Sequence, residues 1–226
     1  MSRFLPSQQI RADDGLVLGS LAMTMGGVLL GAILRAPHAF GVTALLVIAL
    51  LIGGWALTGS RRLAWLLPFG FVAGVLELWA DWIHVEHFGS LVYTDYFGFR
   101  LLASPSYMAV GWWLTVVQFG YVALRLADRW RPWQAVATVT FLGMTIPPWY
   151  EEFAAPARAW HYTTAGPAVS NTPLWVILTY GGCTFSIATA ALLLYRGGRW
   201  PHALAGGFFT GAGITLSGII WFALLG

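Results

Sequence analysis

Ionisable side chains at one end of an otherwise apolar segment are the residues of this sequence best suited to chemistry. Glu77, Asp81 and His84 follow one another at i, i+4 and i+7, a spacing that places all three on one face of an α-helix. Glu77 would lie about 21 Å along a helix crossing a hydrocarbon core of about 30 Å. A charged group at that depth is costly, so its default interpretation is functional. His87 continues the stripe if the helix extends that far, whereas Glu86 points away.

A second acidic cluster ends a later apolar run. Glu151 and Glu152 follow Pro147 and Pro148 closely. The prolines lack N–H donors and are expected to kink or unwind the last turn of this helix. Freed carbonyls and two acids would then crowd one spot beside the polar loop 160–173. We expect one of the two glutamates to be functional, and the sequence does not select between them.

The two acidic clusters lie in segments of similar order. In each segment an apolar run ends in acids, a Tyr-Thr pair follows, and a proline opens the next apolar run. Tyr93 precedes Pro105 by 12 positions and Tyr162 precedes Pro173 by 11. The similar spacing predicts two related units, at about residues 63–125 and 133–195.

The composition indicates the elements that must position these residues. With 58% hydrophobic and 9% charged residues and a mean hydropathy of +0.70, the chain is too apolar for an ordinary soluble surface. Seven apolar runs are long enough to cross a bilayer: 15–35, 39–57, 63–82, 106–125, 133–150, 172–195 and 202–225. We therefore expect an all-α integral membrane bundle of seven transmembrane helices. It would form a single domain over residues 1–226, with a polar N-terminal segment 1–14 and an internal parallel repeat of helices three-four and five-six.

The arginines predict the orientation of the bundle. Nine of them flank the runs on the side of the N-terminus, and only Arg35, Arg100 and Arg158 lie on the other side. The positive-inside rule then places the N-terminus in the cytoplasm and the C-terminus outside a bacterial inner or cell membrane. These arginines account for the net charge of +3, so we expect no nucleic-acid partner. Glycine-rich helix faces fit packing within one chain or between chains equally well, so no oligomeric state is predicted.

Two further exclusions follow from residue usage. The sequence has no lysine, which excludes a seven-helix retinal protein because such a protein needs a lysine Schiff base. Its single cysteine, Cys183, permits no internal disulfide.

Residues of the two units follow the same order as the motifs of a known protein family. The first unit has Glu77, then HFGSLVYT at 87–94, then Pro105. The second unit has, in order, Pro148, Glu151, Trp160, His161, Tyr162, Gly166, Pro167, Asn171 and Trp175. Over about residues 70–180 the chain thereby resembles the carotenoid biosynthesis proteins of the carotenoid hydratase type, and more distantly the small integral-membrane lycopene and terpene cyclases. The resemblance implies a membrane enzyme that acts on isoprenoids.

The same residues suit acid-catalysed chemistry on an alkene. Protonating a C=C bond needs a carboxylic acid that a low-dielectric site keeps neutral until use, and Glu77 is the best-placed candidate. If Asp81, Glu151 or Glu152 directs water onto the cation, the enzyme is a hydratase. If a neighbouring double bond attacks first and a base removes a proton, it is a cyclase. No cofactor is required.

Aromatic faces would stabilise the cation, at about 2 kcal/mol or more when desolvated. The partners are then the lipid bilayer and a hydrophobic isoprenoid dissolved in it. The candidate substrate-binding residues are Trp79, Tyr93, Trp112, Trp113, Trp160, His161, Tyr162, Asn171 and Trp175.

Three other interpretations remain open at this point. The acids and histidines could be packing or interfacial residues, the favoured interpretation for the histidines. They could instead be ligands of a metal-dependent lipid enzyme, from the set Glu77, Asp81, His84, His87 and His161, with Glu151. No His-x-x-x-His or Glu-x-x-His motif supports that set. The protein could also be a non-enzymatic lipid carrier or transporter, in which the membrane acids couple proton movement.

Overall fold

The computed structural model describes residues 12–94, 98–163, 166–195 and 199–226. Residues 1–11 of the polar segment 1–14, including Arg3 and Arg11, therefore lie outside the described residues. Arg196 also lies outside them.

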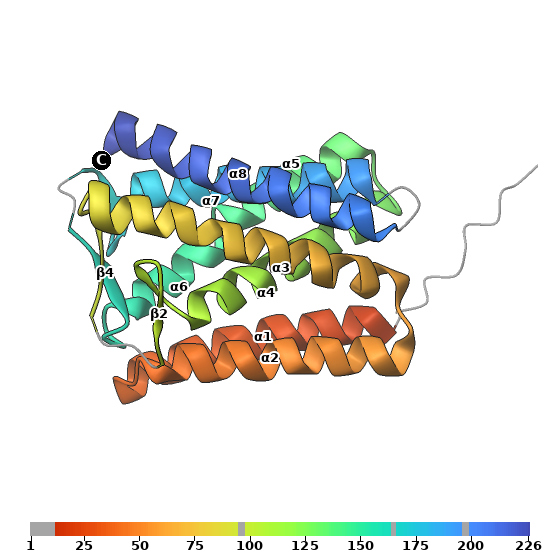
Figure 1. Ribbon diagram of the computed structural model, residues 1–226, viewed down its shortest axis with the longest axis horizontal. Coiled ribbons are helices and arrows are strands. Elements are labelled where there is room, and N and C mark those ends of the chain that lie inside the picture. Colours follow the sequence, from red (N-terminus) through yellow and green to blue (C-terminus); the bar gives the residue numbers. More distant parts are fainter. Residues whose placement is uncertain (1–11, 95–97, 164–165, 196–198) are drawn as a thin grey trace, which may run out of the picture.

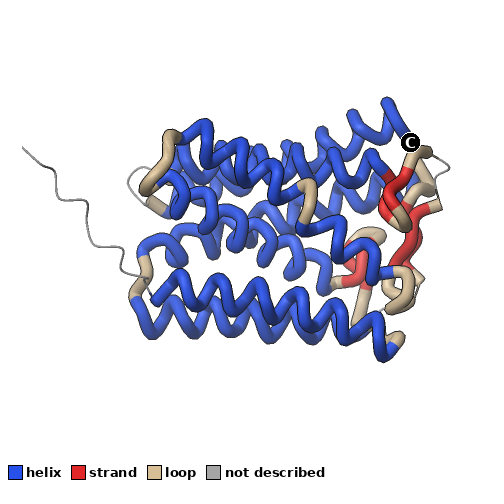
Figure 2. Tube along the Cα trace, turned by 180° about the vertical axis from the view of Figure 1, so that it is seen from behind, coloured by secondary structure: helices blue, strands red, loops and turns tan. Residues whose placement is uncertain are grey.

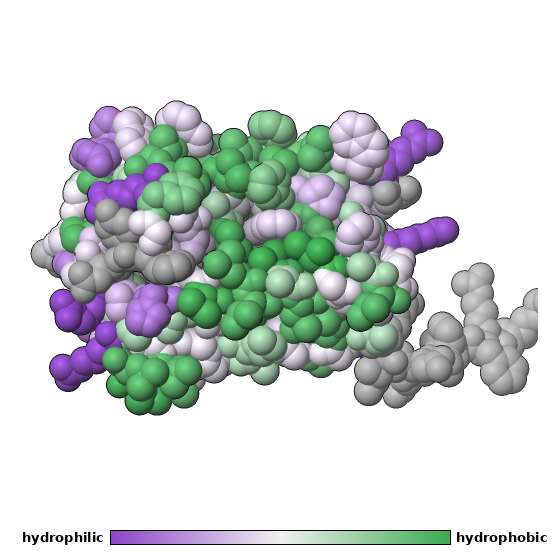
Figure 3. All heavy atoms as spheres, turned by 60° about the horizontal axis from the view of Figure 1, so that its bottom comes forward, coloured by the Kyte–Doolittle hydropathy of each residue, from purple (hydrophilic) through white to green (hydrophobic). Residues whose placement is uncertain are grey.

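The described chain is a bundle of helices that run side by side (Figure 1). Its α-helices are α1 (Ala12–Leu34), α2 (His38–Thr58), α3 (Arg61–Trp82), α4 (Tyr107–Ala127), α5 (Pro132–Gly143), α6 (Ile146–Ala154), α7 (Leu174–Leu194) and α8 (Trp200–Leu225). A short π-helix, η1 (Ile83–His87), extends α3. Six helices in the described ranges are long and apolar enough to cross a membrane: α1, α2, α3 with η1, α4, α7 and α8. Apolar side chains cover the middle of the face drawn in Figure 3, and hydrophilic side chains gather at its two ends, as expected of a membrane protein.

The predicted fifth helix, over residues 133–150, is wrong as a single element. It consists of α5 and α6, which are separated after Gly143. Pro147 and Pro148 open α6 instead of ending α5. A proline is tolerated in the first turn of a helix because the N–H it lacks would have no partner there. Together α5 and α6 run from one end of the bundle to the other, so the start of α1 and the C-terminus lie at opposite ends (Figure 1).

Short strands gather at the end of the bundle near the C-terminus (Figure 2). They are β1 (Leu91–Tyr93), β2 (Arg100–Leu101), β3 (Ser104–Pro105), β4 (Trp160–Tyr162), β5 (Ala168–Val169) and β6 (Thr172–Pro173). β1 pairs antiparallel with β4, and the pairs β2–β3 and β5–β6 are hairpins. The all-α prediction missed these strands, because two or three residues are too few to show an alternating pattern.

The order helix, strand, hairpin, helix occurs twice along the chain. In the hairpins the register pairs Arg100 with Pro105 and Ala168 with Pro173, five positions apart in both cases. The antiparallel pair β1–β4 joins the two segments, with Val92 opposite His161 at its centre. An internal repeat of the two units stays a prediction.

Helix α3 is held closely from two sides. A Cβ added at Gly74 would lie 2.5 Å from the carbonyl oxygen of Ala109 in α4, and one added at Gly211 of α8 would lie 2.5 Å from Cβ of Leu76. Small residues let membrane helices approach closely enough for backbone contacts. The position of the acids on α3 is therefore fixed by backbone packing against α4 and α8.

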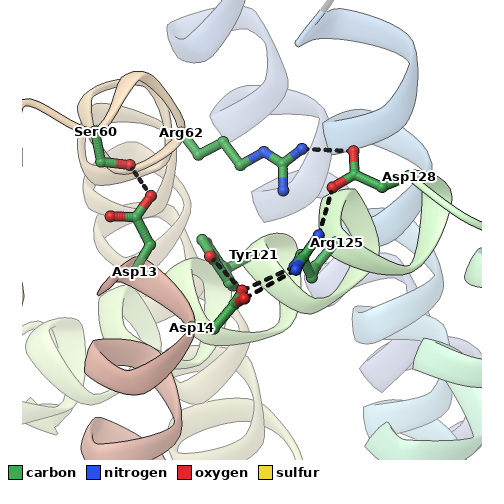
Figure 4. Close-up of polar contacts among 7 residues, drawn as sticks. All are labelled: Asp13, Asp14, Ser60, Arg62, Tyr121, Arg125 and Asp128. Atoms are coloured by element: carbon green, nitrogen blue, oxygen red, sulfur yellow. Dashed lines mark hydrogen bonds and ion pairs between the residues drawn. The ribbon is translucent and has the colours of Figure 1, made fainter. Parts of the chain in front are cut away.

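Polar side chains connect the helix ends at the opposite end of the bundle (Figure 4). The carboxylate of Asp14 accepts hydrogen bonds from the Tyr121 hydroxyl at 2.8 Å and from Arg125 at 2.9 Å. Asp128 accepts from Arg62 at 2.6 Å and from Arg125 at 3.0 Å. This network connects α1 and α3 to α4. Arg62 and Arg125, two of the nine arginines assigned to the side of the N-terminus, form ion pairs in it.

Candidate functional site

A buried cavity at the strand-bearing end brings the two acidic clusters together. Glu77, Asp81 and Glu151 line it and are only 2%, 7% and 4% exposed. Aromatic side chains form much of the remaining wall: Tyr93, Trp112, Trp160, Tyr162, Trp175 and Tyr180. The structure therefore places three predicted acids from distant parts of the sequence in one largely aromatic chamber.

Glu77 and Asp81 lie one helical turn apart on α3, and both carboxyl groups line the cavity. Asp81 accepts hydrogen bonds from the Tyr93 hydroxyl and, at 2.8 Å, from Ser104. Oε2 of Glu77, by contrast, receives no bond from any donor in the described part of the chain. The two carboxyl groups therefore differ in their donors, and a carboxyl group without donors is the better suited of the two to carry a proton.

Glu151 accepts hydrogen bonds from three side chains. The donors are Trp160 Nε1 at 2.6 Å, the Tyr162 hydroxyl at 2.9 Å and the Tyr180 hydroxyl at 2.5 Å. Three donors directed at one buried carboxyl group match a carboxylate, which only accepts. The cavity thus holds one acid without donors and one carboxylate with three.

Two of the tyrosines lie in strands, outside the membrane-spanning helices. Burial, reinforced by the charge of Asp81, raises the pKa of the Tyr93 phenol well above its ordinary value. Burial and the charge of Glu151 do the same to the pKa of Tyr162. Both phenols therefore stay protonated at neutral pH and act as donors to the carboxylates.

The predicted stripe on α3 reaches the cavity as far as His84. The His84 ring stacks on Trp175 with centroids 4.6 Å apart, and its Nδ1 lies 2.9 Å from the Ser90 hydroxyl oxygen. His87 is exposed and packs against Trp82 instead. The wider turn of η1 rotates His87 out of the stripe, which corrects the prediction that it continues there.

Four predicted substrate-binding residues lie outside the cavity. Trp79 is 50% exposed on the outer face of α3, and Trp113 packs against Phe71. His161 is exposed because alternate side chains of β4 point to opposite sides, so Trp160 and Tyr162 face inward. The fourth, Asn171, is exposed in the hairpin β5–β6.

Glu152 also lies outside the cavity. Its carboxylate accepts hydrogen bonds from the Asn171 backbone N–H at 3.1 Å and from Thr172 Oγ1 at 2.8 Å. Neighbouring helix positions point in different directions, so Glu152 holds the hairpin β5–β6 while Glu151 faces the cavity. The geometry therefore places Glu151, and not Glu152, in the cavity; which of the two is functional stays a prediction.

The residues of the metal interpretation are not gathered in one place. Glu77, Asp81 and His84 line the cavity, but His87 and His161 are exposed. Within the described ranges, no group of three His, Cys, Asp or Glu side chains is arranged to hold a metal ion.

Sequence reasoning missed Tyr180, Ser104 and Ser90. Tyr180 donates to Glu151 from the second turn of α7, and Ser104 donates to Asp81 from β3. Ser90 lies beside the ring of His84. Nothing in the sequence separates Tyr180 from other aromatic residues of apolar helices. The signal for Ser104 is its place directly before Pro105, which matches Thr172 before Pro173 in the other hairpin.

The helices and the cavity define a helical membrane protein with a buried cluster of acids. Residues 78–225, more than half of the chain, match the domain of unknown function DUF6989, and the chain belongs to that family. No curated protein and no solved structure matches the chain. The matched range contains Asp81 and Glu151, begins one residue after Glu77, and leaves α1 and α2 outside.

Proposed function

We propose that this protein is an integral-membrane enzyme that modifies an isoprenoid or carotenoid by protonating a C=C bond. The observation that carries the proposal is the division of roles in the cavity. Oε2 of Glu77 has no donor in the described part of the chain, whereas three donors are directed at the carboxyl group of Glu151. Such a pair of carboxyl groups with opposing environments is the usual arrangement of an acid and a base.

The reaction begins when the O–H group of Glu77 delivers its proton to one carbon of a trisubstituted alkene. The π electrons form the new C–H bond, and the other carbon becomes a tertiary cation. The faces of Trp112 and Trp175 attract this cation, at about 2 kcal/mol or more in a desolvated site. The carboxylates of Asp81 and Glu151 add opposite charge to the same chamber.

The cation can react in two ways, and each gives a balanced reaction. In hydration, water attacks the cation and loses a proton to a carboxylate, so the product is a tertiary alcohol. In cyclisation, a neighbouring double bond attacks and the resulting cation loses a proton to Glu151, so the product is an isomer of the substrate. The resemblance to carotenoid hydratases and to lycopene and terpene cyclases, on Glu77, Glu151 and the strand residues, supports both fates.

Mass spectrometry of cellular lipids tests this function. Cells that express the protein are fed a panel of linear isoprenoids and carotenoids, and cells that express the Glu77→Gln variant serve as the matched control. We expect a product heavier by one water for a hydratase, or an isomer of unchanged mass for a cyclase. If no substrate of the panel changes, the proposal is wrong. Conversion by the purified protein in detergent, without a gradient, would further separate an enzyme from a carrier.

The proposed orientation places the N-terminus in the cytoplasm of a bacterial cell and the acid cavity near the outer leaflet. It is supported by the arginine distribution and by the opposite positions of the α1 start and the C-terminus (Figure 1). A reporter that is active only outside the cytoplasm should be active when fused after Gly226. A reporter active only in the cytoplasm should be inactive there, and the reverse pattern would overturn the orientation.

A further inference from the structure

We propose that a second, apolar cleft beside the acid cavity binds the hydrocarbon tail of a linear, uncharged isoprenoid and limits its length. The cleft lies between the hairpin of α1 and α2 on one side and α4 and α6 on the other. The inference rests on the proposed function for the identity of the reactive end, which would lie in the acid cavity.

One face of α4 forms the floor of this tail cleft. The lining residues Tyr107, Gly111, Leu114, Thr115 and Gln118 follow one another at helical spacing. The opposite wall comes from α1 and α2 and consists of Thr24, Val28, Phe40, Thr43 and Ala44. None of the lining residues is charged, which favours a neutral chain over a phospholipid whose phosphate would require a cationic partner.

The tail cleft adjoins the acid cavity. Met108, Trp112, Trp160 and Tyr180 line both. At the junction the rings of Trp112 and Tyr180 stack with centroids 5.5 Å apart. Tyr180 also donates to Glu151, so the side chains between the two spaces belong to the acid site itself. A single extended molecule that displaces these rings would reach from the tail cleft to the acids.

A polar group closes the far end of the tail cleft. Gln118 is only 3% exposed, and its Nε2 donates to Ser20 Oγ at 3.1 Å and to Thr24 Oγ1 at 3.3 Å. From Tyr107 to Gln118 the α4 floor spans about 16 Å at the rise of an α-helix. A hydrocarbon end cannot replace the bonds of the amide, so this end sets the longest chain that fits.

The wall of the tail cleft that α1 and α2 form lies outside the residues that match the family. Residues 78–225 include α4 and α6, whereas Thr24, Val28, Phe40 and Ala44 precede them. We therefore expect the hairpin of α1 and α2 to determine which tail this protein's acid chamber receives.

Gly111 offers a direct test of the tail cleft. A Cβ added there meets no heavy atom within 4 Å, so a side chain at this position starts in open space, and Gly111 lines the cleft. Binding of radiolabelled geraniol, farnesol and geranylgeraniol to the purified protein in detergent is measured. We expect Gly111→Leu to weaken geranylgeraniol binding by about tenfold, because buried methylene groups of the longest chain lose their place. Geraniol binding should change least, and Gly111→Ala should have an intermediate effect.

A matched control is Gly53→Leu on the exposed side of α2, where an added Cβ also meets nothing within 4 Å and which does not line the tail cleft. It should bind all three alcohols as the original protein does. Equal losses for every chain length, or no loss with Gly111→Leu, would overturn the inference. Binding is measured without turnover, so alcohols that bind with this length dependence but are never converted would refute the proposed reaction alone.

Discussion

Replacing Glu77 by Gln is expected to reduce conversion of the isoprenoid substrate by about 10²-fold to 10⁴-fold, the usual contribution of a general acid. The amide has the shape of the carboxyl group and can still donate a hydrogen bond, but it cannot release a proton at neutral pH. The folded protein and its affinity for the substrate should therefore be retained. Initial rates of product formation by the purified variant in detergent, with substrate binding measured in parallel, provide the check.

The matched control for this prediction is Glu86→Gln. Glu86 lies less than three helical turns after Glu77 on the same continuous helix, but it is exposed and does not line the cavity. This variant should convert substrate at the original rate. A Glu77→Gln protein that keeps more than about a tenth of the original rate would remove Glu77 from the acid role, because such a loss is below the range of acid catalysis.

The helix positions were predictable because long apolar runs specify membrane helices almost by themselves. The common face of Glu77, Asp81 and His84 followed from helical periodicity and is confirmed, since all three line the cavity. The break between α5 and α6 was misplaced because proline is compatible with both the end and the first turn of a helix. Local sequence therefore indicated that the helix is irregular there, but not where the break lies.

The parts of the site that depend on long-range contacts were not predictable. The sequence placed Glu151 and Glu152 side by side, and only the positions of β4 and of the hairpin β5–β6 show which acid faces inward. Trp79 and Trp113 were expected at the cavity because they lie next to polar residues in the sequence. Their rings point elsewhere because the direction of a helical side chain is set by its position around the helix.

The largest effect on stability is expected from Glu151→Leu. The two side chains have similar volumes, so the change removes the acceptor without leaving a large cavity. Trp160 Nε1 and the hydroxyls of Tyr162 and Tyr180 would then be donors without an acceptor in a buried site. A buried polar group left unsatisfied costs about 1 to 3 kcal/mol, so the loss should reach about 3 kcal/mol or more. Thermal unfolding of the purified protein in detergent, followed by tryptophan fluorescence, measures it.

Two further variants separate the lost acceptor from a general effect of the substitution. Glu152→Leu removes an acid at the neighbouring position, where the exposed Asn171 can turn to water. The buried Thr172 hydroxyl keeps the carbonyl oxygen of Pro148 as an acceptor. The loss of stability of this variant should be below about 1 kcal/mol, the usual net value of a hydrogen bond. Glu151→Gln keeps one acceptor oxygen and should fall between the two. If Glu151→Leu is no less stable than Glu152→Leu, the three donors do not depend on Glu151, and its assignment as a carboxylate held by them is wrong.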